Sequence, residues 1–133
     1  MSVHALDHVN ILTDDLDATV RFYETALGLT RGETPGAAMG YKGAWMCEPG
    51  GKAIVHLGLK QPGADYGPDN IPGEVTGAIH HVAFRCSGFE AAKARLDAAG
   101  YDYRANSYEH IGLCQIMVFD PNRVQVEMNF PDG

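Results

Sequence analysis

The sequence predicts an α+β fold in which two similar modules, each with the element order β-α-β-β-β, form a curved mixed sheet. Residues 6–11 (LDHVNI) align with residues 79–84 (IHHVAF), and the offset from His8 to His81 is 73 positions (81 − 8). Each copy is followed by a segment with helical spacing of apolar residues and then by strand-like runs. A repeat of this kind indicates a duplicated structural unit.

The segment after the first copy, residues 13–29, predicts an amphipathic helix. Its apolar residues recur at helical spacing: Leu16, Val20, Tyr23 and Leu27. Asp14 or Asp15 can cap the start of this helix, and Gly28 can end it.

The segment after the second copy, residues 87–100, predicts the matching helix. Its apolar stripe consists of Phe89, Ala92, Leu96 and Ala99. Ser87 and Glu90 have the spacing of a capping box, so we expect the helix to begin after Ser87 and to stop at Gly100.

Strand-like runs close each half of the sequence. They cover residues 43–48 and 52–59 in the first half, and 113–120 and 123–130 in the second. The turns EPGGK and DPNR separate them, which is typical of hairpins. One further strand is expected within residues 30–35 (TRGETP) and another within 101–106 (YDYRAN).

The domain organisation follows from these elements. We expect residues 1–133 to form a single domain, with module one over about 4–59 and module two over about 77–131. Residues 60–76 between them are rich in proline and glycine, and this predicted linker is long enough to cover a site as well.

Composition excludes several classes of function. The formal net charge is −7, with 17 acidic and 10 scattered basic residues, which argues against binding of nucleic acid or of an anionic membrane. No apolar run approaches the length that spans a membrane, and the N-terminus lacks the features of a signal peptide. The three cysteines form no CxxC pair, which indicates reduced thiols in a cytoplasmic protein.

Polar residues interrupt the predicted strands at matched positions. His8 and His81 share the first strand of each module, and His56 and Glu127 lie in the last strand of each, 71 positions apart (127 − 56). An unpaired carboxylate within a strand is costly to bury, and a shared divalent ion would offset that cost. A His-His-Glu set with open positions suits Fe(II), and a fourth protein ligand suits Ni, Co, Zn or Mn as well.

The two-residue period of a strand assigns these side chains to one face. Val9 is expected to pack on the helix, which turns His8 and Asn10 to the opposite face. The same alternation separates His81 from Val82, and it leaves His80 to form a hydrogen bond at the rim of the sheet. The remaining inner-face residues are His56, Glu127, Gln115, Met117 and Asn129.

The motifs LDHVNI, FYETALGL, HHVAF and FDPNRVQVEMNF resemble those of the vicinal oxygen chelate superfamily over almost the whole chain. This superfamily includes glyoxalase I, methylmalonyl-CoA epimerase, fosfomycin-resistance proteins and extradiol dioxygenases. The last motif resembles the family's DPxG…E ending, with Arg123 in place of the usual glycine. GAW at 43–45 and the pair His56-Leu57 also resemble small proteins related to biphenyl-2,3-diol 1,2-dioxygenases.

The resemblance implies that both modules curl around a central metal cavity and that the metal binds two neighbouring oxygens of a small substrate. By motif position, the implied ligands are His8, His81 and Glu127. His56 would be either a fourth ligand or the residue that moves protons. The expected pocket residues are Asn10, Trp45, Gln115, Met117 and Asn129.

The first functional expectation is therefore an extradiol-type dioxygenase with Fe(II), in which His56 acts as base and then as acid. Met117 stands about where those enzymes carry a tyrosine, which counts against this reaction. The alternatives are a glyoxalase-like or epimerase-like enzyme with a redox-inert metal, and a non-catalytic antibiotic-binding protein. We also expect a homodimer, since paired modules often bury their sheet edges in that way.

Overall fold

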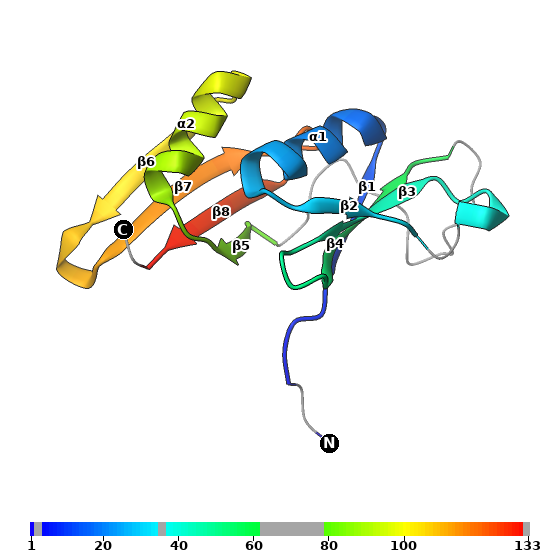
Figure 1. Ribbon diagram of the computed structural model, residues 1–133, viewed down its shortest axis with the longest axis horizontal. Helices are drawn as coiled ribbons and strands as arrows, with labels where there is room; N and C mark the ends of the chain where they lie inside the picture. The colour runs from blue at the N-terminus through cyan, green and yellow to red at the C-terminus, as the bar shows by residue number, and fades with distance from the viewer. Residues whose placement is uncertain (2–3, 35–36, 62–78, 132–133) are drawn as a thin grey trace.

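The first module of the computed structural model is a four-stranded mixed sheet with one long helix (Figure 1). The model describes residues 1, 4–34, 37–61 and 79–131. The elements of module one are β1 (Val9–Thr13), α1 (Leu16–Leu27), β2 (Thr30–Gly32), β3 (Gly43–Cys47) and β4 (Ala53–Leu59). The strand order is β1-β4-β3-β2, in which β1 runs parallel to β4 and the other pairs are antiparallel.

The second module repeats this arrangement in the order β5-β8-β7-β6. Its elements are β5 (Val82–Arg85), α2 (Phe89–Ala99), β6 (Tyr103–Tyr108), β7 (Leu113–Phe119) and β8 (Gln125–Phe130). Short 3-10 turns at Ala37–Met39 and Glu109–Ile111 precede β3 and β7. The predicted α+β fold of two β-α-β-β-β modules is confirmed. The predicted linker, 60–76, lies outside the described residues except for its first two positions.

The helix ends agree with the sequence at three of the four positions. Asp15 caps α1 by accepting a hydrogen bond from the Ala18 backbone N–H at 3.0 Å, and Gly28 ends it with φ 68°. The capping box predicted at Ser87 is wrong. The chain turns through Gly88 at φ 77°, which becomes the N-cap without a side-chain hydrogen bond, so α2 begins one residue later than the box requires.

The first strand of each module begins later than the repeat suggests. β1 starts at Val9 and β5 at Val82, so His8 and His81 each lie one residue before a strand. Leu6 is 79% exposed, because pairing of β1 with β4 begins only at Val9. The two histidines therefore project from the sheet edge at equivalent places.

The strand register relates the last strands of the two modules. Asn10 of β1 pairs with His56 of β4, and Ala83 of β5 pairs with Glu127 of β8. Because Asn10 and Ala83 are 73 positions apart (83 − 10), His56 and Glu127 occupy equivalent places in their modules.

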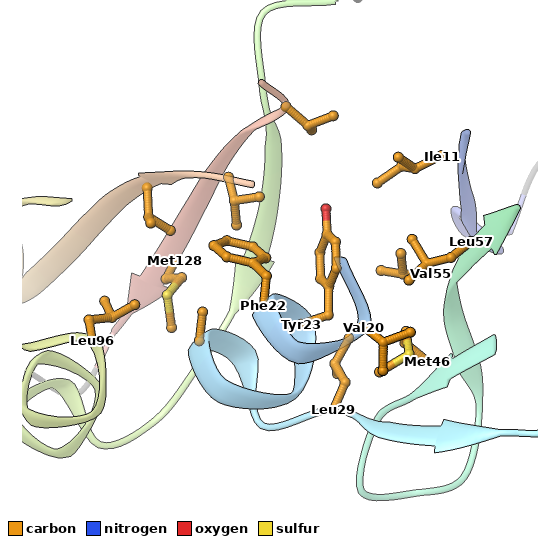
Figure 2. Packing of buried hydrophobic residues seen from close by; sticks show 14 of the residues in the cluster. Ile11, Val20, Phe22, Tyr23, Leu29, Met46, Val55, Leu57, Leu96 and Met128 are labelled. Carbon is orange, nitrogen blue, oxygen red and sulfur yellow. The ribbon is translucent and has the colours of Figure 1, made fainter. Parts of the chain in front are cut away.

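Both helices cover the same side of the molecule, and α1 lies between the two sheets (Figure 1). Figure 2 shows Phe22 on the side of Met128 in module two, whereas Val20 and Leu29 face Met46 in module one. The strand residues that alternate with these buried ones lie on the other side of each sheet, which we call the open face.

A buried polar network also joins the modules. The Tyr23 hydroxyl of α1 donates a hydrogen bond to Asp120 Oδ2 at 3.1 Å, and Asn122 Nδ2 donates to Thr19 Oγ1 at 3.0 Å. Asp120 and Asn122 belong to the turn between β7 and β8. Since Tyr23 and Asp120 are both buried, these bonds fix how module two sits against α1.

Candidate metal centre

Three rings stack on the open face of module one. The rings of His8 and His56 lie 3.8 Å apart between centroids with 14° between their planes. The ring of Trp45 on β3 stacks on the ring of His56, with centroids 4.1 Å apart and 7° between the planes. Trp45 and His56 are register partners on β3 and β4, so this stack follows directly from strand pairing.

Neighbouring groups set the chemistry of the two module-one histidines. His8 Nδ1 lies 2.7 Å from Asp7 Oδ2, and a histidine that donates to this carboxylate through Nδ1 has its Nε2 lone pair free for a ligand. The same hydrogen bond, together with Lys52, lowers the pKa of Asp7. Partial burial, followed by the positive charge that His8 can carry, lowers the pKa of His56 and favours its neutral form.

In module two, His81 and Glu127 face each other on the open side of the sheet. His81 Nε2 lies 3.6 Å from Glu127 Oε2. His81 Nδ1 lies 2.9 Å from Nδ1 of His80, as expected for a hydrogen bond at the rim. For His81 to present its Nε2 lone pair, its Nδ1 carries the proton and donates to His80. Asp7 aligns with His80 in the repeat, and each lies within hydrogen-bond distance of Nδ1 of the histidine that follows it. The sequence did not predict this contact for Asp7.

Two amides hold the other oxygen of Glu127. Asn129 Nδ2 donates a hydrogen bond to Glu127 Oε1 at 2.8 Å, and Gln115 Nε2 donates to the same oxygen at 3.2 Å. Gln115 Nε2 also donates to Asn129 Oδ1 at 2.8 Å. Gln115 and Asn129 are register partners on β7 and β8, so the three side chains form a closed triangle.

The four candidate ligands come together as two separate pairs. His8 contacts His56, and His81 faces Glu127. Among the described residues, no group of three or more histidine, cysteine, aspartate or glutamate side chains lies close enough to hold one ion. Each module of a single chain therefore presents half of the predicted ligand set.

A cavity of about 580 Å³ lies between the modules, but it is not the meeting point of the ligands. Its walls include Asn10 of β1, His81, and Arg123 of the turn before β8. Of the four candidate ligands only His81 lines it. Asn10 lines this cavity on the side of module one that faces module two.

The remaining predicted pocket residues are on the open faces. Met117 of β7 is the register partner of Glu127, just as Trp45 is the partner of His56. The three cysteines are free thiols, as the sequence indicates. In the part of the chain that the structure describes, neither helix is long and apolar enough to cross a membrane.

The duplicated β-α-β-β-β modules define the class of protein: an α+β fold whose two sheets carry polar side chains at equivalent places on one face. Residues 5–128 match the family described as the Glyoxalase/Bleomycin resistance protein/Dioxygenase superfamily. The chain therefore belongs to this family, the vicinal oxygen chelate superfamily that its motifs resemble.

Individual relatives agree with this assignment. The chain is 26% identical over 128 residues to "Glyoxylase I 4" of Arabidopsis thaliana, covering 93% of this chain and 69% of that protein. The structure of lactoylglutathione lyase from Agrobacterium tumefaciens is similar, with a TM-score of 0.62, 22% identity and coverage of 98% and 96%. A glyoxylase/bleomycin resistance protein/dioxygenase domain from Frankia sp. EAN1pec has a TM-score of 0.67, 20% identity and coverage of 97% and 93%. The two structures show the shared fold.

Proposed function

We propose that this protein is a metal-dependent lyase or isomerase that binds a small substrate through two neighbouring oxygen atoms. A divalent Ni, Co, Zn or Mn ion would be held by His8, His56, His81 and Glu127. The strand register carries this proposal, because His56 occupies in module one the place of Glu127 in module two. That equivalence favours His56 as a fourth ligand, in the same role as the carboxylate.

The donor atoms of module two fit a shared ion. The 3.6 Å between His81 Nε2 and Glu127 Oε2 is too long for a hydrogen bond. Two donors that bind one ion at roughly 2.0–2.2 Å lie roughly 3.0–3.5 Å apart, which is close to this separation. Imidazole nitrogens and a carboxylate oxygen also suit these divalent ions.

When bound, such an ion supplies Lewis acidity at a substrate carbonyl. The protein side chains around it bind and orient the substrate. Trp45 offers a flat apolar wall on module one, and Met117 offers a flexible apolar wall at the equivalent place on module two. These walls would hold the carbon frame of the substrate while its two oxygens face the ligands.

We further propose that two chains assemble each site. A single chain keeps its two ligand pairs apart within the described residues, and the edge strands β1 and β5 each pair with only one neighbour in their sheets. In a homodimer, module one of one chain would face module two of the other. His8 and His56 would then share an ion with His81 and Glu127 of the second chain.

Metal analysis and turnover of the purified protein test this function. We expect about one Ni, Co, Zn or Mn ion per chain after reconstitution. His81→Ala and Glu127→Ala should each lose most of it, whereas His110→Ala, an exposed histidine of the turn before β7, should not. Turnover is tested by formation of lactoylglutathione, the thioester for which the Agrobacterium enzyme is named. A protein that binds no metal after reconstitution would refute the proposal.

The ring stack favours a second candidate, an extradiol-type dioxygenase with Fe(II). A nitrogen lone pair lies in the plane of its imidazole ring. Two nearly parallel rings with centroids 3.8 Å apart, as in His8 and His56, therefore do not both aim at one ion in this conformation. His56 would then handle protons beside an iron held by His8, His81 and Glu127. The register favours the first candidate, because His8 is partly exposed and its ring can turn, whereas the strand pairing is fixed.

Anaerobic purification with Fe(II), followed by catechols and oxygen, separates the two candidates. Oxygen uptake and a coloured ring-cleavage product would support the dioxygenase. In that case His56→Ala should keep its iron and lose turnover. If His56→Ala instead loses the metal and the wild-type protein takes up no oxygen, the dioxygenase is excluded.

A further inference from the structure

We propose that Gln115 and Asn129 are positioning residues that make Glu127 a ligand through one oxygen only. This inference rests on the proposed metal centre and assigns the residues that orient its carboxylate. Both amides donate to Oε1, at 3.2 Å and 2.8 Å, while Oε2 is the oxygen that faces His81 Nε2. The carboxylate is thus divided into an oxygen held by the protein and an oxygen directed toward the other ligand.

The hydrogen-bond pattern of this triangle permits only one orientation of the two amides. An ionised carboxylate can only accept, so both side chains must turn their nitrogen toward Glu127. Gln115 Nε2 has two hydrogens, and it gives one to Glu127 Oε1 and the other to Asn129 Oδ1. Both donors of Gln115 are therefore used within the protein, which assigns this residue to the carboxylate rather than to the substrate.

The equivalent positions in module one lack these amides. Gly43 and Gly58 are register partners there, as Gln115 and Asn129 are in module two. A Cβ at Gly43 would lie 2.5 Å from the Tyr41 side chain, and a Cβ at Gly58 would lie 2.7 Å from it. The Tyr41 side chain thus occupies the space that side chains at these two positions would need. The module-one ligand, His56, is instead oriented by its stack on Trp45. Each module thus carries the support that its own ligand type requires, an amide pair for a carboxylate and an aromatic plane for an imidazole.

A fixed carboxylate affects how many positions on the ion stay open. If Glu127 were free to turn, both of its oxygens could bind the ion and occupy two coordination positions. The bonds to Oε1 disfavour that turn, because Oε1 would have to leave two donors behind. A Glu127 that binds through Oε2 alone leaves adjacent positions for two substrate oxygens.

Co²⁺ binding to the full-length protein tests this assignment without substrate. Gln115→Leu and Asn129→Leu remove the donors at similar side-chain size, and each should raise the Kd for Co²⁺ by about 10- to 100-fold. Their Co²⁺ absorption bands should also weaken, as the coordination number rises when Glu127 turns to bind through both oxygens. Asn129→Ala, which removes the same donor without adding a charge, should act in the same direction if the leucine variant does not fold.

Gln125→Leu is the matched control. Gln125 lies on the same face of β8 as Asn129, two residues to the other side of Glu127, and should leave both readouts unchanged. If the amide variants fold and bind Co²⁺ with wild-type Kd and spectrum while Glu127→Ala loses the metal, only the positioning role is overturned. If Glu127→Ala also binds as tightly as wild type, the proposed metal centre is overturned and the positioning role with it.

Discussion

Trp45 is the only tryptophan of the chain, and its ring lies 4.1 Å from that of His56 between centroids. Its fluorescence should therefore report directly on His56. We expect titration with Co²⁺ or Ni²⁺ to change the emission of Trp45 in proportion to metal bound, because an ion on His56 would lie beside the indole. The measurement is steady-state fluorescence of the metal-free protein during titration.

The His56→Ala variant distinguishes the two roles of this histidine, because alanine offers no donor atom to the ion. If His56 is a ligand, the fluorescence response and the tight binding should be lost together. If it handles protons, the variant should still bind metal through His8, His81 and Glu127. Unchanged metal affinity in His56→Ala would therefore contradict the four-ligand centre and favour the dioxygenase.

Tyr23 makes a second test at the residue scale, this time of stability. Tyr23→Phe removes the hydrogen bond from its hydroxyl to buried Asp120 and should lower the free energy of unfolding by about 1–2 kcal/mol at neutral pH. Burial, and then the Asp120 charge, raise the pKa of Tyr23 above its ordinary value. Above pH of about 10 the hydroxyl ionises in the unfolded chain but not in the folded one, so the stabilisation is lost as pH rises.

Urea unfolding of the wild type and of Tyr23→Phe at pH 7 and near pH 10.5 checks both effects. The difference in stability between them should shrink at the higher pH, since only the wild type carries this hydroxyl. A difference that stays constant with pH would show that Tyr23 titrates alike in the folded and unfolded states.

At the scale of elements, the same hairpin turn occurs in both modules. Glu48 accepts hydrogen bonds from the backbone N–H groups of Gly50 and Lys52, and Asp120 accepts them from those of Asn122 and Val124. The equivalence also covers the fourth residue of each turn. That residue has a positive φ in both modules, 92° at Gly51 and 67° at Arg123.

Arg123→Gly should therefore stabilise the protein. A residue with a side chain costs roughly 1–2 kcal/mol in the left-handed region, and Arg123→Gly removes that cost. Part of this stabilisation is offset, because glycine loses more conformational entropy on folding. We expect the free energy of unfolding to rise by about 0.5–1 kcal/mol, with a Tm higher by a few degrees. Thermal unfolding followed by circular dichroism measures it.

Gly51→Ala is the paired control for this prediction. A Cβ at Gly51 meets nothing within 4 Å, so any effect comes from the backbone alone. The alanine variant should lose about as much stability as Arg123→Gly gains. Equal Tm values for all three proteins would contradict the strain at Arg123.

These elements also show how far sequence patterns reach. The α1 cap at Asp15 was predictable, because a carboxylate stands directly before the helical spacing. The start of α2 was not predictable. Ser87 has the spacing of an N-cap, but the chain makes a left-handed turn at Gly88, and the helix begins only after that residue. Strand alternation assigned His56, Glu127, Gln115 and Asn129 to one face. It did not predict that both amides bind the same oxygen of Glu127, because cross-strand partners depend on register.

At the scale of the whole molecule, the repeat of 73 residues predicts two modules but not how they sit together. The packing of α1 between the sheets decides this, through contacts such as Phe22 with the module-two core and the bond from Tyr23 to Asp120. That packing keeps the pair His8–His56 apart from the pair His81–Glu127. No sequence pattern specifies such an arrangement, because it depends on contacts between residues far apart in the chain.

Complementation between two defective chains tests whether each site is shared. One chain carries His8→Ala with His56→Ala, and the other carries His81→Ala with Glu127→Ala, so neither should bind metal tightly by itself. In a heterodimer with shared sites, module one of the second chain meets module two of the first, and all four ligands are present. Random pairing makes about half of the dimers heterodimers, and each heterodimer has one intact site out of two. Co-refolded mixtures should therefore recover about one quarter of the metal that the wild-type protein binds.

The mixture is measured by metal analysis after gel filtration, with each chain refolded alone as control. If each site formed within one chain, every chain in the mixture would lack one half of its ligands, and co-refolding would recover nothing. Recovery near one quarter would support sites built from module one of one chain and module two of the other. Because the bond from Tyr23 to Asp120 helps to fix how module two sits against α1, Tyr23→Phe introduced into both chains should lower the recovered fraction.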